Sequence, residues 1–284
     1  MPYPKDHRLD VHEVIEKGEF NGRLFLPVLQ ALSQLGIEQV KKIDFLTTGI
    51  LPDPEDPTFP EYALGLILIL DQAPRTVFKG VDTRYSYSFF GPMAIKLIRR
   101  LKDLPPHLVP YNRDRWVREL GYPIDHWFFA LFWFMAPITH SELLVDQEYQ
   151  VTIWDSAKKD NMKINHGLSD PYAEALKGEL GRDVLAFARE VEKGLPTEEE
   201  LGRPLSFGDY VYWFAMIFHI HLPIIDKFGR YPYRNGAVGR DTTEEEKDFL
   251  VKTGYWSCVD EEVAEKIRED LEKGVWSPLN TTAD

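Results

Sequence analysis

The sequence is poorest in cysteine, since Cys258 is the only one among its 284 residues. A lone cysteine excludes an intramolecular disulfide and a zinc site built from thiolates. Basic residues are scarce too, because 33 Lys and Arg stand against 46 Asp and Glu and give a net charge of -13. Nucleic acids and anionic membranes attract basic faces, so this balance argues against both as partners.

Long apolar runs are also missing. The N-terminal stretch MPYPKDHRLDVHEV lacks the apolar core of a signal peptide. The most apolar stretch, residues 127–138, is too short to span a bilayer and contains Pro137. We therefore expect a cytoplasmic protein without membrane insertion.

Standard cofactor and catalytic motifs are absent from the sequence. It contains no GxGxxG, P-loop, GxSxG or HExxH pattern. His219 and His221 are a close pair, but two residues apart on a helix they point in different directions and cannot chelate one metal. We expect no cofactor and assign no metal site, although His140, Glu142 and Asp146 offer ligand types that a divalent ion accepts.

What the sequence does contain is apolar residues at helical spacing. Residues 23–45 carry one apolar stripe with spacings of three and four, and residues 62–70 are apolar nearly all round. Between them, the four prolines of LPDPEDPTFP (51–60) forbid a regular helix. The pattern predicts an all-α fold of stacked helical hairpins in a single domain. We expect a helical extension over 1–42, a core over 43–275 and a disordered tail over 276–284.

Helix starts are marked by Ser, Thr or Asp ahead of acidic residues. Such starts are predicted at Thr139/Glu142, Ser206/Asp209, Thr242/Glu245 and Asp260. A further helix is expected to begin near Pro171 and to run to about Lys193.

The first polar segment interrupts apolar surroundings at Asp71, Gln72 and Arg75. Burying a carboxylate and an amide is costly unless they are paired. Arg75, four residues after Asp71, is the nearest partner, although Pro74 bends the path between them. The segment is thus either a structural ion pair at a helix end or part of a site.

The second polar segment, residues 136–147, contains His140, Glu142, Asp146 and Gln147. If a helix covers them, Glu142 and Asp146 share one face, where like charges repel unless a cation or a proton lies between them. His140 can supply that cation. The segment is either an acid–base pair for a substrate or, for Glu142, a helix cap alone.

The third polar segment, residues 224–240, brings Arg230, Arg234 and Arg240 into apolar surroundings. These arginines either neutralise the carboxylates of the other two segments or hold an anionic ligand. Aromatic residues crowd two other stretches and either fill the core or form the walls of a cavity. They are Trp127, Phe128, Phe129, Phe132, Trp133 and Phe134 in one stretch, and Tyr210, Tyr212, Trp213, Phe214 and Phe218 in the other.

Together, LDQAPRTVFKG, PITHSELLVDQE and IIDKFGRYPYRNGAVGRDTTEEEKDFL resemble the hallmark blocks of the bacterial and fungal family called domain of unknown function 924. The resemblance covers residues 43–255 and marks the chain as a divergent, fungal member. It departs from the family pattern at Thr76 and Tyr233, where the family has Asn and His. The proline-rich connector 51–60 also stands where the family has a helix rich in Trp and acidic residues.

The resemblance implies a fold similar to tetratricopeptide repeats, with the three blocks converging on one concave site, and it implies no particular reaction. By position, it transfers the polar set Asp71, Gln72, Arg75, His140, Ser141, Glu142, Asp146, Gln147, Arg230, Arg234 and Asn235. From this set we expect catalysis by His140, Glu142, Asp146 and Arg75. We expect substrate contacts from Asp71, Gln72, Trp133, Trp213, Arg230, Tyr233, Arg234 and Asn235.

Three functions fit these residues. The first is a cofactor-independent enzyme that isomerises or cyclises a hydrophobic small molecule, such as a terpenoid or polyketide intermediate of specialised metabolism. It would hold one reactive conformer and polarise a carbonyl. The second is a helical-repeat module that binds a partner protein. The third is a scaffold whose polar blocks are buried ion pairs, and no oligomeric state follows from the sequence.

Overall fold

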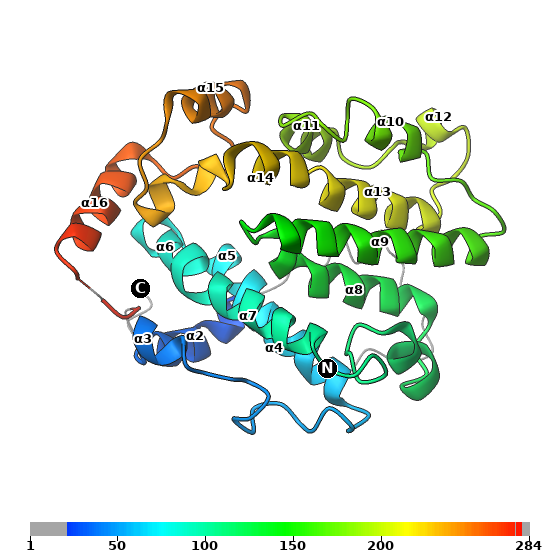
Figure 1. Cartoon of the computed structure of the whole chain (residues 1–284), viewed down its shortest axis with the longest axis horizontal. Coiled ribbons are helices and arrows are strands. Elements are labelled where there is room, and N and C mark those ends of the chain that lie inside the picture. Colours follow the sequence, from blue (N-terminus) through cyan, green and yellow to red (C-terminus); the bar gives the residue numbers. More distant parts are fainter. Residues whose placement is uncertain (1–21, 276, 280–284) are drawn as a thin grey trace. The chain divides into compact units, whose positions relative to one another are not determined.

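The computed structural model describes residues 22–275 and 277–279, and over these residues it is helical and contains no strand (Figure 1). This confirms the expected all-α class. In this part of the chain no helix is long and apolar enough to cross a membrane. Of the predicted N-terminal extension, residues 1–21 lie outside the described residues, as do 276 and 280–284 of the predicted tail.

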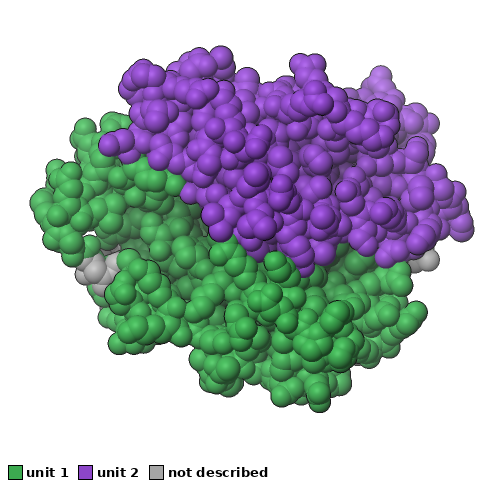
Figure 2. Space-filling view, viewed as in Figure 1, with its two compact units in different colours: residues 1–137, 236–240, 259–284 green, residues 138–235, 241–258 purple. Residues whose placement is uncertain are grey.

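The chain forms two compact units, coloured separately in Figure 2. Unit 1 contains residues 1–137, 236–240 and 259–284, and unit 2 contains residues 138–235 and 241–258. The chain passes four times from one unit to the other, so neither unit is one continuous stretch of sequence.

Unit 1 is built from short helices, three of which are single π-helical turns. Its elements are η1 (Gly22–Phe25), α2 (Leu26–Ser33), α3 (Ile37–Val40), α4 (Phe59–Ile67), η2 (Leu68–Gln72), α5 (Ala73–Val77), η3 (Gly80–Asp82), α6 (Thr83–Tyr85), η4 (Ser86–Phe90), α7 (Gly91–Lys102), η5 (Arg115–Glu119), η7 (Gly236–Val238) and α16 (Glu261–Glu272). Helix α8 (Ile124–Thr139) begins in unit 1, and its last residues belong to unit 2.

Residues 51–58 of the proline-rich connector in unit 1 are non-helical as predicted and are held by a buried arginine. The Arg115 guanidinium donates to the carbonyls of Pro54 and Asp56, each at 2.9 Å. Helix α4 then begins at Phe59, with Pro60 in its first turn. A proline costs little in a first turn, where the backbone N–H would have no partner within the helix.

The expected single stripe over 23–45 is divided into two short helices. Gly36 interrupts it between α2 and α3 with a φ of 73°, a value that residues with a Cβ atom rarely adopt. At the other end of unit 1, Leu279 is buried, and its backbone N–H donates to Ser33 Oγ at 3.1 Å. Of the tail expected to be disordered, Leu279 is therefore in contact with α2.

Unit 2 is centred on two long helices that run side by side, α9 (Leu144–Ile164) and α13 (Phe207–His219). Two buried amides join them, since Gln150 donates to the carbonyl of Phe218 at 2.8 Å and Asn161 donates to that of Gly208 at 3.0 Å. The remaining elements are α10 (Ala173–Lys177), α11 (Ala186–Lys193), α12 (Glu198–Leu201), α14 (Leu222–Phe228), η6 (Pro232–Arg234) and α15 (Glu244–Lys252).

The predicted helix starts differ in outcome. Ser206 with Asp209 forms the expected capping box, and Asp260 is the N-cap of α16. The box of α15 lies one residue later than predicted, at Thr243 and Glu246. The box at Thr139 and Glu142 is wrong, because α8 continues to Thr139 and α9 begins only at Leu144, without a side-chain cap.

The helix predicted from Pro171 to Lys193 is also wrong, because α10 ends at Lys177 and α11 begins at Ala186. Between them, Gly181 approaches the carbonyl of Leu176 so closely that a Cβ atom there would lie 1.9 Å from the oxygen. The chain therefore turns at a glycine that a spacing pattern does not reveal.

Candidate functional site

The candidate site lies in unit 2, where α8 ends and the chain turns towards α9. The last carbonyls of a helix have no partners within it and need other donors. Gln147 donates its amide to the carbonyls of Thr139 at 2.8 Å and Ser141 at 2.7 Å. Tyr231 donates its hydroxyl to the Thr139 carbonyl at 2.5 Å, and Arg234 Nη1 donates to that of His140 at 2.7 Å. The second and third polar segments thus meet around one helix end.

The two carboxylates of this turn have different surroundings. Asp146 is buried and accepts a hydrogen bond of 2.5 Å from Ser141 Oγ. Glu142 accepts one of 3.0 Å from the backbone N–H of Tyr231, and its side chain is 27% exposed. Since Glu142 precedes α9, the premise that both carboxylates share one helix face is wrong. Asp146 is fixed inside the turn, whereas Glu142 is fixed but reachable from solvent.

Arg234 connects these groups. Its guanidinium lies over the ring of Tyr231 with 4.2 Å to the centroid, a cation–π arrangement, and Nη1 is 4.0 Å from Glu142 Oε1. Tyr231 is fully buried, and burial raises the pKa of its phenol well above the usual range. Tyr231 therefore acts as a hydrogen-bond donor and as an apolar support for Arg234.

Arg230 belongs to a separate pair that the sequence analysis missed. Its Nε and Nη2 atoms contact the two carboxylate oxygens of Glu246 at 2.5 Å and 2.8 Å. Asn235 donates to the same carboxylate at 3.2 Å. The hydrogen bonds from Arg230 lower the pKa of Glu246 to about 2. Arg230 is thus neutralised by Glu246 of α15, a residue outside the three polar segments.

Histidine and aromatic residues complete the interior of unit 2. His221 is buried, and burial lowers its pKa to about 3, so its ring is neutral. The ring packs on Phe187 with 4.0 Å between centroids, and Nδ1 lies 2.8 Å from the Ile217 carbonyl. Tyr233 packs edge-on against Trp256 at 5.4 Å. These contacts are those of a packed core.

The first polar segment lies in unit 1 and forms its own cluster. Arg75 Nη2 is 3.3 Å from Asp71 Oδ1, so the predicted pairing is confirmed. Gln72 donates to the other oxygen of Asp71 at 2.5 Å. The Arg75 guanidinium also lies over the ring of Tyr87, with 5.3 Å to the centroid. Asp71 is therefore held by its chain neighbours.

The two tryptophans predicted to contact substrate have ordinary packing partners. Trp133, in the unit 1 part of α8, packs edge-on against Phe132 at 4.7 Å. Trp213, on α13, donates its indole N–H to the Gly194 carbonyl at 3.0 Å and packs on Phe214 at 5.5 Å. Both tryptophans are half-buried, and each packs on the residue next to it in the chain.

The structure therefore gathers the predicted site residues into separate clusters. The turn after α8 gathers Glu142, Asp146 and Arg234 with the backbone of His140. Asp71, Gln72 and Arg75 form a second cluster in unit 1. Within residues 22–275 and 277–279, no three His, Cys, Asp or Glu side chains are grouped as ligands for a metal ion.

The three polar segments belong to a region that matches a known protein family. Residues 51–254 match the model of the family described as bacterial protein of unknown function (DUF924). The match covers most of the chain and contains all three polar segments, so the protein belongs to this family. No curated protein and no solved structure matched the chain.

Proposed function

We propose that the protein is a cofactor-independent enzyme that isomerises or cyclises a hydrophobic small molecule, with Glu142 as its proton-transferring group. One observation carries the proposal. Glu142 is a carboxylate held by a backbone N–H and placed 4.0 Å from the Arg234 guanidinium, yet its side chain remains partly exposed. A general base must be both positioned and within reach of a substrate proton.

The neighbouring residues suit an apolar substrate. Leu143, Leu144 and Val145 follow Glu142 directly, and all three side chains are exposed. They offer apolar surface beside the carboxylate, and the buried Arg234 guanidinium, 4.0 Å away, balances the charge of that carboxylate. In an isomerisation, Glu142 removes a proton from the carbon next to a substrate carbonyl and returns it to another carbon, so no co-reactant is consumed. A cyclisation such as a cycloaddition needs no proton transfer and uses the same positioning.

We also propose a substrate class and a cellular compartment. A carbonyl-bearing terpenoid or polyketide intermediate of specialised metabolism has a large apolar body, which suits the exposed apolar side chains beside Glu142. With one cysteine and no apolar run of bilayer length, we place the protein in the cytoplasm.

The test uses the fact that isomerisation and cyclisation conserve mass. Purified protein is incubated without cofactors in an apolar metabolite extract of the native host, and products are followed by liquid chromatography with mass spectrometry. We expect one compound to convert into another of identical mass. Glu142→Gln should slow a proton-transfer conversion by roughly 10²–10⁴-fold. The matched control is Glu148→Gln, which changes an exposed glutamate in the first turns of α9.

Two results would overturn the proposal: no mass-neutral conversion by the wild-type protein, or full conversion by Glu142→Gln where the product differs from its precursor in the position of a proton. Thermal unfolding of both variants separates chemistry from scaffolding. If Glu142→Gln unfolds the protein while Glu148→Gln does not, the carboxylate is a structural tie of the 231–234 segment.

The exposed residues Leu143, Leu144 and Val145 also favour a second candidate, a helical-repeat interaction module with tetratricopeptide-like hairpins. Adjacent exposed apolar side chains often mark a protein interface. Leu144→Asp should then abolish partner capture without affecting any small-molecule conversion. An enzyme that binds its substrate there should instead lose conversion in the same variant.

A further inference from the structure

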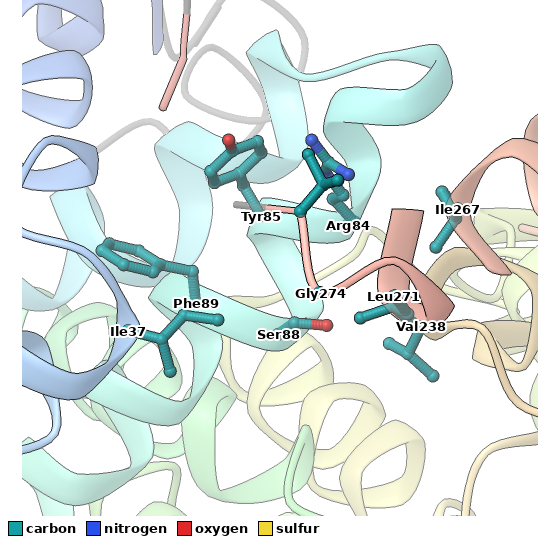
Figure 3. Close-up of a pocket in the computed structure, with 10 residues that line it drawn as sticks. Ile37, Arg84, Tyr85, Ser88, Phe89, Val238, Ile267, Leu271 and Gly274 are labelled. Carbon is teal, nitrogen blue, oxygen red and sulfur yellow. The ribbon is translucent and has the colours of Figure 1, made fainter. Parts of the chain in front are cut away.

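A cavity of about 220 Å³ lies within unit 1, and none of the residues assigned to the proposed reaction lines it (Figure 3). Its deep side is formed by the buried side chains of Tyr85, Phe89 and Ile267. Its rim carries Leu271 and Val275, two apolar side chains that are 56% and 44% exposed. Exposed apolar residues around an apolar hollow are typical of a small-molecule site.

The cavity wall contains an irregular helix. Residues 86–90 form the π-helical turn η4 between α6 and α7, and Ser88 of this turn lines the cavity. A π turn inserts one extra residue into a helix and changes where the side chains on either side point. The next residue is glycine, because a Cβ atom at Gly91 would lie 2.7 Å from the carbonyl oxygen of Ser86.

One polar group of the cavity lining lacks a partner. Arg84 lines the cavity, and its Nη1 atom donates to Asp270 Oδ2 at 2.9 Å. Its Nε–H is buried without an acceptor, while the Tyr85 hydroxyl, which also lines the cavity, interacts with the same guanidinium. A buried donor without an acceptor costs about 1–3 kcal/mol, so a ligand oxygen that accepts this proton would be favoured.

The charges around Arg84 indicate whether the ligand oxygen that accepts the Nε proton should be charged or neutral. Lys266 also pairs with Asp270, and burial raises the pKa of Asp82 while the nearby Arg84 cation opposes that rise. Two cations and two carboxylates therefore balance at this end of the cavity. An additional carboxylate or ammonium group would upset that balance, whereas a neutral carbonyl oxygen accepts the Nε proton without adding charge.

The cavity volume limits the ligand's size. An engineered apolar cavity of about 150 Å³ in another protein holds benzene, so about 220 Å³ suits roughly eight to ten non-hydrogen atoms. We propose that this cavity binds an uncharged carbonyl compound with an aliphatic body of that size, with Arg84 as the donor to its oxygen. The proposal does not depend on the reaction proposed for Glu142.

The test compares three probes of equal chain length: 2-octanone, octanoate and octylammonium. Each is titrated into the full-length protein carrying ¹³C-labelled methyl groups on Ile, Leu and Val, and the methyl spectrum is recorded by NMR. We expect 2-octanone to shift the signals of Ile37, Val238, Ile267 and Leu271, which line the cavity. Ile217, in the core of unit 2, should not respond. The Kd for 2-octanone should be at least about tenfold lower than for either charged probe.

Two variants locate the site. Ser88→Phe places a large ring at the exposed edge of the cavity and should raise the Kd for 2-octanone at least about tenfold. Ser156→Phe changes an exposed serine on α9 and should leave it unchanged. Arg84→Lys keeps the charge but removes the Nε donor, so it should also raise the Kd about tenfold.

Three results would overturn the proposal: no selective shifts with 2-octanone, tighter binding of octanoate or octylammonium, or unchanged binding in Ser88→Phe. If Arg84→Lys fails to fold, Ser88→Phe decides the outcome.

Discussion

Gln147 shows at the scale of one residue how the turn after α8 is held. Its side chain is fully buried, and its amide nitrogen lies within hydrogen-bond distance of the carbonyls of Thr139 and Ser141 and of the Tyr231 hydroxyl. An amide nitrogen has only two protons, so the two shortest contacts, to Thr139 and Ser141, are the principal ones. A single glutamine thereby supplies donors that the end of α8 cannot supply itself.

His221 leads to a prediction about pH. In the folded protein its pKa is about 3, whereas in the unfolded chain it is near 6.5. Below pH 6.5 the unfolded chain therefore binds a proton that the folded protein does not, so stability falls as the pH falls from 6.5 towards 3. Between pH 7.5 and pH 5 the loss from this residue should be about 2 kcal/mol.

His221→Phe removes the titrating group and keeps a ring against Phe187. Urea unfolding at pH 7.5 and pH 5 should show that the wild-type protein loses about 2 kcal/mol more than the variant over this interval. His166→Phe, at an exposed position, is the control and should keep the wild-type dependence. An identical pH dependence in His221→Phe and the wild type would refute a neutral, buried His221.

Single residues also show what the sequence could reveal. The Asp71–Arg75 pair was predictable because its members are four residues apart. The Arg230–Glu246 pair was not, because its members are separated by 16 residues and Arg230 lies in a loop whereas Glu246 lies on α15. Glu246 lies in an acidic run, TTEEE, where composition alone suggests a solvated helix start.

At the scale of elements, one side chain of α15 makes two kinds of contact. Glu246 closes the capping box with Thr243, whose backbone N–H donates to it at 2.8 Å, and it also binds Arg230. The helix start and the 230–235 segment are therefore fixed by the same carboxylate. Sequence patterns placed this helix within one residue, because capping chemistry is local, but could not find its tertiary partner.

Glu246→Ala tests this double role. It removes the cap and leaves the partly buried Arg230 without its carboxylate, so unfolding free energy at pH 7 should fall by about 2–3 kcal/mol. The folded pKa of Glu246, about 2, lies below its ordinary value of 4.5. Its contribution is therefore present above pH 4.5 and is lost as the pH falls towards 2, so the wild type and the variant should converge there.

Glu244→Ala is the matched control, since this glutamate of the same turn is 90% exposed and pairs with Lys247 on the surface. Denaturant unfolding should show a change within about 0.5 kcal/mol. Equal losses in both variants would mean that the acidic start of α15, rather than the bond to Arg230, provides the stability.

At the scale of the whole molecule, the fold class was predictable and the division into units was not. Helical spacing and capping residues are local signals, so they identified an all-α chain. The units depend on contacts between distant segments, such as Phe228 with Phe249 at 5.2 Å and Phe187 with Trp256 at 5.1 Å. Hydrophobic spacing shows that a helix has an apolar face but not which other helix that face will contact. The family blocks identified the polar residues but not the residues with which they pair.

The interleaved chain leads to a prediction about fragments. Unit 2 needs residues 241–258, which supply Glu246 to Arg230, Phe249 to Phe228 and Trp256 to Phe187. A fragment of residues 138–235 lacks all of these contacts, whereas residues 138–258 contain the complete unit. We expect the longer fragment to unfold cooperatively on heating and to resist proteolysis, and the shorter one to do neither. Glu246→Ala in the longer fragment should lower its Tm, because it removes one of the same contacts. Equal behaviour of the two fragments would show that α9, α13 and α14 form a sufficient core by themselves, and that α15 only covers it.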